Sequence, residues 1–305
     1  MIAKKKKTIP NNYRDLENLF RDWRSFENPV IYNGAPDYRK SQLIESQKEY
    51  ESLKTRLYEI DTTKWPFQYQ VDWNIVLAEM NGYDFNYRIL KPWERDPAFY
   101  QTVWMYQSDV PAHEGPTNHG VLEFWTYDFP LSKDDEKRLE KELLVIPPLL
   151  SQARENLTGN AKDLWVAGIE NFKSQNDDLD VIRRKVGNAN QLLVDAIKKS
   201  QSVTNEFLLW LEGKTSSKTG HSGVGKENYT WYQQNVHLIP MTWEEEVELL
   251  KRELNRAWSS LKLEEQRNKD LPKMESAETV EEFSDLCEKS VIKMMEFLKE
   301  KEIMP

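Results

Sequence analysis

Residues 220–226 carry the most suggestive chemical pattern in the sequence, because a glycine-rich stretch ending in lysine can surround a phosphate group. Gly220-His-Ser-Gly-Val-Gly-Lys226 matches the first seven positions of a phosphate-binding loop. The eighth residue is Glu227, where such loops need a serine or threonine hydroxyl for magnesium, and its carboxylate would repel a triphosphate. The periodicity also predicts a helix before this segment, whereas a phosphate loop follows a strand. We interpret the match as coincidental.

A second pattern is His113-Glu114 with His119 six positions after the first histidine. Zinc-dependent hydrolases of the His-Glu-x-x-His type place both histidines on one helical face, and the glutamate activates the zinc-bound water. The spacing here is wrong for that face, and Gly115 and Pro116 disfavour a regular helix. We therefore predict an exposed loop, and we assign no catalytic residue and no metal ligand in this chain.

The segment from residue 223 to residue 237 offers the best candidate for binding. A glycine turn leads into a helix start, whose free N–H groups favour an anionic group such as a carboxylate. The candidate substrate-binding residues are Gly225, Lys226, Tyr229, Tyr232 and His237. The alternative is that the aromatic residues of this segment simply pack against other aromatic residues.

The composition limits the possible partners. The chain has 305 residues, a net charge of −9 and a pI of about 5.2, so a nucleic-acid partner is not expected. No apolar run is long enough to span a membrane, and no signal peptide follows the lysines at positions 4–7. We predict a cytoplasmic protein with residues 1–12 disordered. The lone cysteine, Cys287, lies at a helical core spacing, which favours a small buried side chain over a nucleophile.

Helical periodicity dominates the chain. Apolar stripes predict helices over residues 43–60, 71–80, 139–146, 150–157, 161–172, 189–211, 247–261 and 283–298. Pro147-Pro148 should break or kink the run that contains it. Three pairs resemble capping boxes at helix starts: Ser132 with Asp135, Thr242 with Glu245, and Thr279 with Glu282.

Between residues 65 and 130 the pattern changes, because aromatic residues and prolines become frequent. We expect irregular structure there, with a short strand near residues 121–125. The sequence therefore predicts a mainly α fold: a multi-helix antiparallel array with an aromatic-rich irregular layer and little or no β structure. Residues 1–305 are expected to form a single helical region, because no glycine- and serine-rich linker divides them.

Several segments together resemble one bacterial family, the domain-of-unknown-function 885 family. They are, in order, Val71-Asp72-Trp73, Ala-Glu-Met-Asn at 78–81, Lys-Pro-Trp-Glu-Arg-Asp-Pro-Ala-Phe-Tyr at 91–100, Ile-Pro-Pro-Leu-Leu at 146–150, Ala-Arg-Glu-Asn-Leu at 153–157, residues 223–232, Met-Thr-Trp-Glu-Glu-Glu at 241–246, and Lys-Glu-Lys-Glu-Ile-Met-Pro at 299–305. The resemblance runs through nearly the whole chain in order and is to the N-terminal half of such proteins.

The resemblance implies a zinc metallopeptidase-like hydrolase acting on peptides. Its His-Glu-x-x-Pro-Gly-His zinc motif belongs to a C-terminal half, and the His113 segment lacks the Pro-Gly of that motif. The expected partner is therefore the missing C-terminal half or an equivalent, and this chain alone should be inactive. An alternative remains open: a non-catalytic helical binding or scaffold module, with an aromatic groove formed by residues 65–125.

Overall fold

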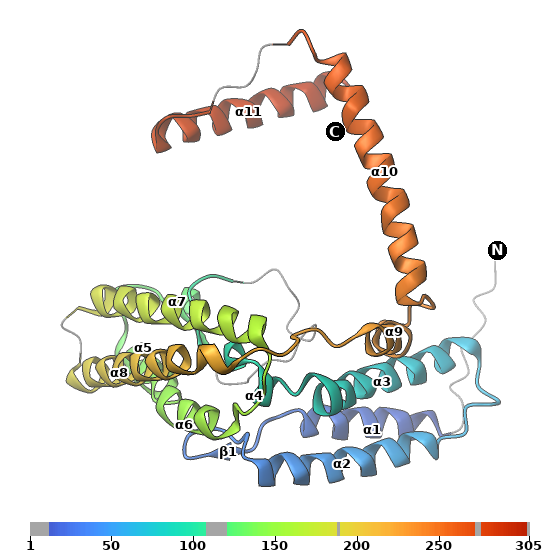
Figure 1. Cartoon of the computed structure of the whole chain (residues 1–305), viewed down its shortest axis with the longest axis vertical. Coiled ribbons are helices and arrows are strands. Elements are labelled where there is room, and N and C mark those ends of the chain that lie inside the picture. Colours follow the sequence, from blue (N-terminus) through green and yellow to red (C-terminus); the bar gives the residue numbers. More distant parts are fainter. Residues whose placement is uncertain (1–11, 108–120, 188–189, 272–275, 304–305) are drawn as a thin grey trace, which may run out of the picture. The chain divides into compact units, whose positions relative to one another are not determined.

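The chain divides into two compact units, Met1–Trp243 and Glu244–Pro305, which are described separately below. This computed structural model describes residues 12–107, 121–187, 190–271 and 276–303 (Figure 1). The predicted fold class is confirmed, because helices form most of both units. Across the described ranges, the strands form two short pairs, β1 (Ile31–Tyr32) with β2 (Ala35–Pro36), and β3 (Val103–Trp104) with β4 (Leu122–Glu123), beside one isolated bridge.

The first part of unit 1 is a three-helix bundle of α1 (Tyr13–Phe26), α2 (Lys40–Tyr58) and α3 (Phe67–Phe85). The predicted stripes at residues 43–60 and 71–80 correspond to α2 and to the middle of α3. The amphipathic helix α1 turns its apolar side inward, whereas α3 buries two polar residues, Asn81 and Asp84, beside its apolar ones. Their shared core includes Leu19, Trp23, Tyr50, Leu57 and Met80.

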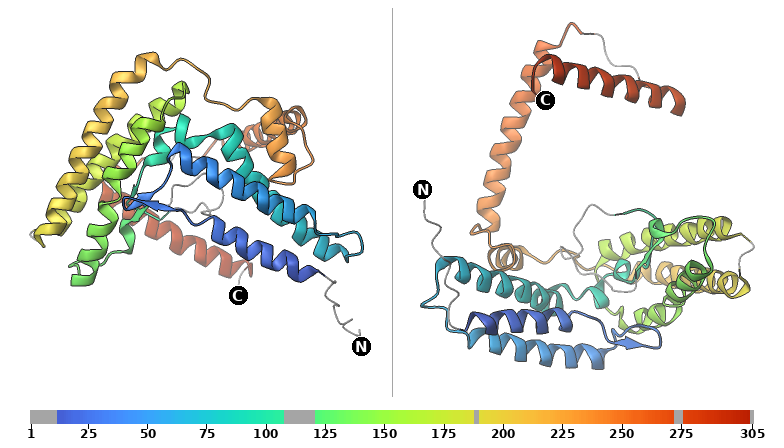
Figure 2. Two further views of the ribbon diagram at one scale, coloured as in Figure 1. Left: turned by 90° about the horizontal axis from the view of Figure 1, so that it is seen from below. Right: turned by 180° about the vertical axis from the view of Figure 1, so that it is seen from behind.

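The second part of unit 1 is built on the pair α7 (Lys162–Val186) and α8 (Gln191–Lys214), which lie side by side (Figures 1 and 2). The helices α5 (Lys133–Leu143) and α6 (Ile146–Asn156) pack on α8. Pro147 and Pro148 lie in the first turn of α6, so the predicted break falls just before them. The core includes Leu143, Trp165, Phe172, Ile182 and Phe207.

Short, irregular elements connect these two parts. A π-helical turn (Asn86–Leu90) follows α3, then come α4 (Pro92–Arg95), a 3₁₀ turn (Pro97–Tyr100), the β3–β4 pair and a second 3₁₀ turn (Phe124–Thr126). The strand predicted near residues 121–125 is β4. A buried glutamine, Gln175 of α7, fixes this layer, because its Oε1 accepts hydrogen bonds from Thr102 N and Val103 N at 2.8 and 3.2 Å.

Unit 1 also contains α9 (Lys226–Asn235), which packs on α3. Unit 2 consists of α10 (Trp243–Arg267), whose first residue closes unit 1, and α11 (Val280–Glu300). Two of the predicted capping boxes are confirmed, because Ser132 Oγ accepts from Asp135 N and Thr279 Oγ1 from Glu282 N, each at 3.1 Å. The helix α10 begins directly after Thr242. Within the described residues, no helix is long and apolar enough to cross a membrane.

Candidate functional site

The predicted binding segment forms a defined structure around α9 in unit 1. Gly225 precedes the helix with a φ of 84°, a conformation that favours glycine, and Lys226 is the first helical residue. Gly225, Lys226 and His237 are exposed, whereas Tyr229 and Tyr232 are half-buried. The helix start therefore lies where the sequence predicted it.

The glycine-rich loop before α9 forms hydrogen bonds with α7 and with Arg95 of α4. Ser222 Oγ accepts hydrogen bonds from Asp163 N and Leu164 N, at 2.8 and 3.3 Å, and so satisfies free N–H groups in the first turn of α7. The guanidinium of Arg95 donates to the carbonyl oxygens of Ser222 and His221 at 2.9 and 3.4 Å. These carbonyl groups point at a cation, which is the reverse of a loop that surrounds phosphate with N–H groups.

Close backbone approach explains the glycine at the start of this loop. A Cβ atom on Gly220 would lie 2.2 Å from the carbonyl oxygen of Asn160. Gly220 also forms a parallel bridge with Ala161, and its carbonyl oxygen accepts from Lys162 N at 3.1 Å. The phosphate-loop match therefore has a structural explanation, in agreement with the sequence interpretation.

A partly buried lysine lies beside the same loop. Lys218 Nζ donates to the carbonyl oxygen of Gly159 at 2.6 Å and lies 4.0 Å from the ring centroid of Trp165. Burial lowers the pKa of the Lys218 ammonium group, and the neighbouring charge of Lys214 acts in the same direction. Its contacts are with the protein itself, so Lys218 serves to hold the loop in place.

Aromatic rings join α9 to α3. Trp231 stacks on Phe85 with ring centroids 5.8 Å apart, and Tyr232 contacts the same ring at 4.7 Å. The imidazole of His237 packs edge-on against Tyr232 at 4.9 Å. Arg88 lies 5.5 Å from the Trp231 ring while it pairs with buried Asp84 at 2.6 Å. The structure thus brings Tyr232 and His237 together.

The other two candidates lie along the same helix. Lys226 Nζ lies 3.9 Å from the ring centroid of Trp243, a cation–π contact. The hydroxyl of Tyr229 accepts a hydrogen bond from Gln233 Nε2 at 2.9 Å. These contacts support the packing interpretation of the segment. They leave the exposed Lys226 and His237 as the candidates best placed to meet an anionic group, and their substrate-binding role stays a prediction.

The described residues do not fit a zinc ion, because they contain no group of three histidine, cysteine, aspartate or glutamate side chains that could hold a metal. His113 and His119 lie outside the described residues, so the loop predicted there stays a prediction. The zinc implied by the family resemblance thus has no site among the described residues.

The aromatic residues expected to line a groove differ in burial. Trp65, Phe85, Phe99 and Tyr100 are buried in unit 1 and pack against neighbouring rings. Others are half-buried, and Phe67, Trp104 and Tyr106 are exposed. In the described part of residues 65–125, the aromatic layer thus contributes to the core, and its role as a groove stays a prediction.

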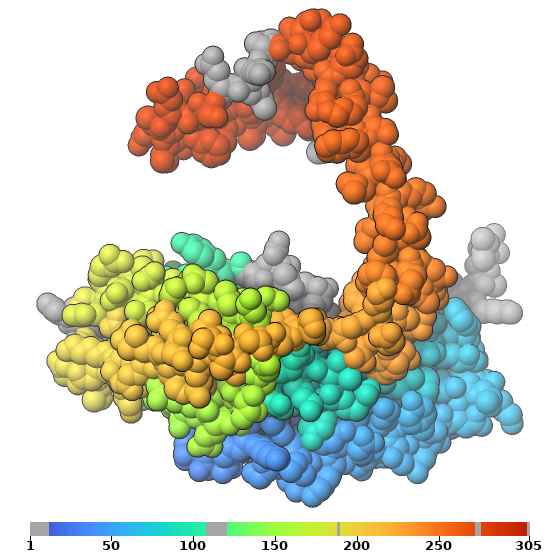
Figure 3. All heavy atoms as spheres, viewed as in Figure 1, coloured from blue at the N-terminus to red at the C-terminus, as the bar shows by residue number. Residues whose placement is uncertain are grey.

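Unit 2 presents a feature that the sequence analysis did not assign to any function. Neither α10 nor α11 buries a residue among those described, and Figure 3 shows each as a column one helix thick. We call the exposed stripes of these helices the α10–α11 apolar face: Leu250, Leu254, Trp258 and Leu261 on α10, and Val280, Phe283, Cys287, Val291 and Met294 on α11. Soluble proteins rarely expose large apolar patches without a binding role.

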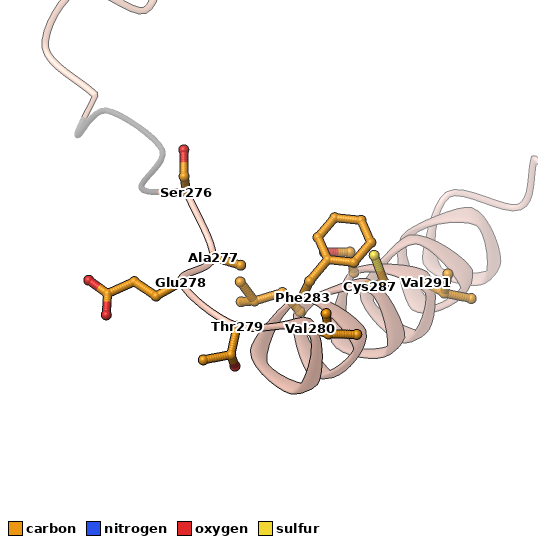
Figure 4. Close-up of a pocket in the computed structure, with 10 residues that line it drawn as sticks. Ser276, Ala277, Glu278, Thr279, Val280, Phe283, Cys287 and Val291 are labelled. Atoms are coloured by element: carbon orange, nitrogen blue, oxygen red, sulfur yellow. The ribbon is translucent and has the colours of Figure 1, made fainter. Parts of the chain in front are cut away.

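An apolar hollow of about 890 Å³ opens at the start of α11 (Figure 4). Phe283, Cys287 and Val291 line it from successive turns of the helix, and Ala277 lines it from the preceding segment. Cys287 was predicted to be buried, and that prediction is wrong, because the residue is exposed. Periodicity placed Cys287 on the apolar side of its helix, but no described element of unit 2 covers that side.

Comparison with known proteins gives the fold alone. No protein-family model and no curated protein matches the chain. A solved structure of a candidate lipoprotein of unknown function from Shewanella oneidensis is similar, with a TM-score of 0.58 and 12% sequence identity. The similarity covers 97% of this chain and 59% of that chain. The chain therefore spans less than two thirds of the length of the protein it resembles in fold.

Proposed function

We propose that this chain is a helical binding module whose binding element is unit 2. The observation that carries the proposal is the α10–α11 apolar face, on which each helix exposes a stripe of large apolar side chains. A helix that stays amphipathic over 25 residues gains its stability from packing that face against another surface. Unit 1 has two complete cores of its own and acts as the scaffold that carries unit 2.

The proposal is tested by the accessibility of unit 2 in the isolated chain at low concentration. We expect fast amide exchange in α10 and α11 compared with α7 and α8, together with binding of an apolar dye such as ANS. Phe283→Lys should reduce dye binding, because Phe283 is 62% exposed on this face. Leu192→Lys is the matched control, since Leu192 is 61% exposed on α8 in unit 1.

Slow exchange of both helices in a dilute monomer would contradict the proposal, because the face would then be covered within the chain. Equal loss of dye binding in the two variants would also count against it. A drop confined to Phe283→Lys would support unit 2 as the binding element.

A second function is proposed from the family resemblance: the chain is the non-catalytic helical part of a metallopeptidase-like hydrolase that acts on peptides. One observation favours it, namely that a similar fold occurs within a longer chain, of which the present chain covers 59%. Under this proposal the zinc ligands belong to other sequence, and Lys226 and His237 contact the peptide.

Reading the coding DNA beyond the codon for Pro305 tests this second proposal. An open frame that continues to a His-Glu-x-x-Pro-Gly-His motif, with zinc binding and peptide cleavage by the longer product, is the expected result. A stop codon, or a longer product that neither binds zinc nor cleaves peptides, would remove the peptidase proposal and leave the binding module.

A further inference from the structure

The sequence contains two Asn-Gly pairs, Asn33-Gly34 and Asn81-Gly82, and unit 1 holds them in opposite environments. Asparagine is among the chemically labile residues. A following glycine makes it more reactive, because glycine has no side chain to hinder attack of its backbone nitrogen on the asparagine amide. The two pairs share this local chemistry, so a difference in their reactivity in the folded chain comes from the structure around them.

Asn33 and Gly34 form the exposed two-residue turn between β1 and β2. Their φ angles are 52° and 84°, as in the Asn-Gly turns that match the twist of a β-hairpin. Open space surrounds the α-carbon of Gly34. Within the described residues, neither the Asn33 side chain nor the Gly34 backbone nitrogen makes a hydrogen bond. The side-chain amide and the neighbouring nitrogen are therefore accessible to each other and to water.

Asn81 and Gly82 lie inside α3, where both groups are engaged. Asn81 is 7% exposed, and its Nδ2 donates a hydrogen bond to the carbonyl oxygen of Asn235 at 3.1 Å. The backbone nitrogen of Gly82 belongs to the hydrogen-bond ladder of the helix. Before this nitrogen could attack the amide, α3 would have to open locally, which costs free energy in a packed helix.

We propose that Asn33-Gly34 is a site of spontaneous covalent modification, at which Asn33 is converted through a succinimide to aspartate and isoaspartate. Asn81-Gly82 stays intact in the folded chain. This modification site lies in unit 1 and is independent of the proposed binding function of unit 2.

The reaction needs only water as a co-reactant. The backbone nitrogen of Gly34 loses its proton to hydroxide and attacks the side-chain carbonyl carbon of Asn33. A carbon–nitrogen bond forms, the bond to Nδ2 breaks, and ammonia leaves, which closes a five-membered succinimide ring. Water then opens the ring. Addition at the former side-chain carbonyl gives aspartate, and addition at the main-chain carbonyl gives isoaspartate. The attacking nitrogen must be deprotonated, so the rate rises with pH.

The isoaspartate product changes the geometry of the hairpin. Its main chain passes through the side-chain carbons of Asn33 and is longer by one CH₂ group, whereas a two-residue turn fixes the pairing of β1 with β2. The strand β2 is held in place, because Gln152 Nε2 donates to the carbonyl oxygen of buried Pro36 at 3.0 Å. The change therefore falls on β1, where the guanidinium of Arg39 lies 3.4 Å from the ring centroid of Tyr32.

Peptide mapping by mass spectrometry of the full chain, aged at mildly alkaline pH, measures both sites at once. Trypsin places them in different peptides, because Arg39 and Lys64 lie between them. We expect the exchange of NH₂ for OH at Asn33 to be at least about tenfold faster than at Asn81, because α3 must open before Asn81 reacts. Conversion at Asn33 should slow markedly at mildly acidic pH.

The chain unfolded in guanidinium chloride at the same pH is the control for intrinsic reactivity. Both sites should convert there at similar rates, because the fold no longer separates them. The variant Asn33→Gln should show no conversion in its peptide on the same timescale, since its longer side chain cannot close the five-membered ring. Asn81 should behave in this variant as it does in the unmodified chain.

Hydrogen exchange over residues 30–37 tests the effect on the hairpin. Asp37 N donates to the carbonyl oxygen of Val30 at 2.8 Å, so its amide reports whether the hairpin is closed. The variant Asn33→Asp carries the new charge on an unchanged main chain and is the matched control. The aged chain, separated by ion exchange from unreacted chain, should exchange faster than this variant over the segment.

Conversion of Asn33 in the unfolded chain without conversion in the folded chain would overturn the proposal, because the turn would then protect the site. Conversion of Asn81 as fast as Asn33 in the folded chain would overturn it too, since the fold would not distinguish the sites. Equal exchange over residues 30–37 in the aged chain and in Asn33→Asp would overturn the effect on the hairpin.

Discussion

At the scale of single residues, Gly220 shows how a functional-looking motif can have a structural cause. The sequence alone could reject the phosphate loop, because Glu227 occupies the magnesium position. It could not show why the glycine is present, because the carbonyl oxygen of Asn160 that excludes a side chain is 60 residues earlier in the chain. Such long-range approach leaves no local pattern in a sequence.

Replacing Gly220 by alanine should therefore lower the free energy of unfolding by roughly 2–3 kcal/mol, because the new Cβ would overlap the Asn160 carbonyl group. Chemical denaturation monitored by circular dichroism measures the change. Gly213→Ala is the matched control, because open space surrounds Gly213 near the end of α8. This control should be neutral or stabilising by about 0.5 kcal/mol. Equal effects of the two substitutions would contradict the close approach.

Tyr13 provides a pH-dependent prediction at the same scale. Burial, followed by the 2.7 Å hydrogen bond that its hydroxyl donates to Asp72, raises the pKa of Tyr13 from 10.0 to about 12. The folded state therefore favours the neutral phenol. The resulting stability is fully present below pH 10 and is lost as the pH rises toward 12.

Tyr13→Phe should remove this part of the alkaline pH dependence. The melting temperature of the unmodified chain is expected to fall between pH 10 and 12 more steeply than that of the variant. Tyr106→Phe is a suitable control, because Tyr106 is 84% exposed. Identical slopes for the unmodified chain and Tyr13→Phe would show that the Tyr13–Asp72 contact does not contribute.

At the scale of elements, periodicity located most of the long helices but missed α1, and it placed helix ends poorly. The helix predicted over residues 161–172 extends in α7 to Val186. The apolar pattern stops at Phe172 because the next inward-facing residue is Gln175, and a polar residue indicates a surface position in such a pattern. In the structure Gln175 is fully buried, and its amide meets the irregular layer and Thr204. A hydrophobic pattern does not detect a buried polar residue whose amide oxygen and nitrogen are both hydrogen-bonded.

Element positioning also depends on Ser222, which caps α7 from a loop about 60 residues away. Ser222→Ala should lower stability by about 1 kcal/mol, as expected for the loss of a helix N-cap. Exposed Ser151 in α6 is the control, and Ser151→Ala should change the stability by less than about 0.5 kcal/mol. Urea titration of both variants measures the difference. A negligible effect of Ser222→Ala would mean that water replaces the hydroxyl at the start of α7.

At the scale of the whole molecule, the sequence predicted the fold class, but it did not predict which helices contribute to a hydrophobic core. The same helical spacing occurs in α8, where Phe207 and Leu211 are buried, and in α11, where Phe283 and Met294 are exposed. A stripe shows which side of a helix seeks an apolar partner, and it does not show whether the chain itself supplies one. The start of α9 lies where the sequence predicted it, and the binding role of its residues stays a prediction, whereas the exposed stripes of unit 2 were found only in the structure.

The location of both hydrophobic cores in unit 1 predicts how the chain unfolds. Both core clusters consist of residues from unit 1, and the helices of unit 2 bury no described residue. Ending the chain after Trp243 should therefore leave the main thermal transition of unit 1 within about 2 °C, because both core clusters are retained in the shortened chain. Differential scanning calorimetry of the full and shortened chains makes the comparison. If the shortened chain melts at a much lower temperature than the full chain even at low concentration, unit 2 stabilises unit 1 directly. If the two melting temperatures differ only at high concentration, the stabilisation comes from association through α10 and α11.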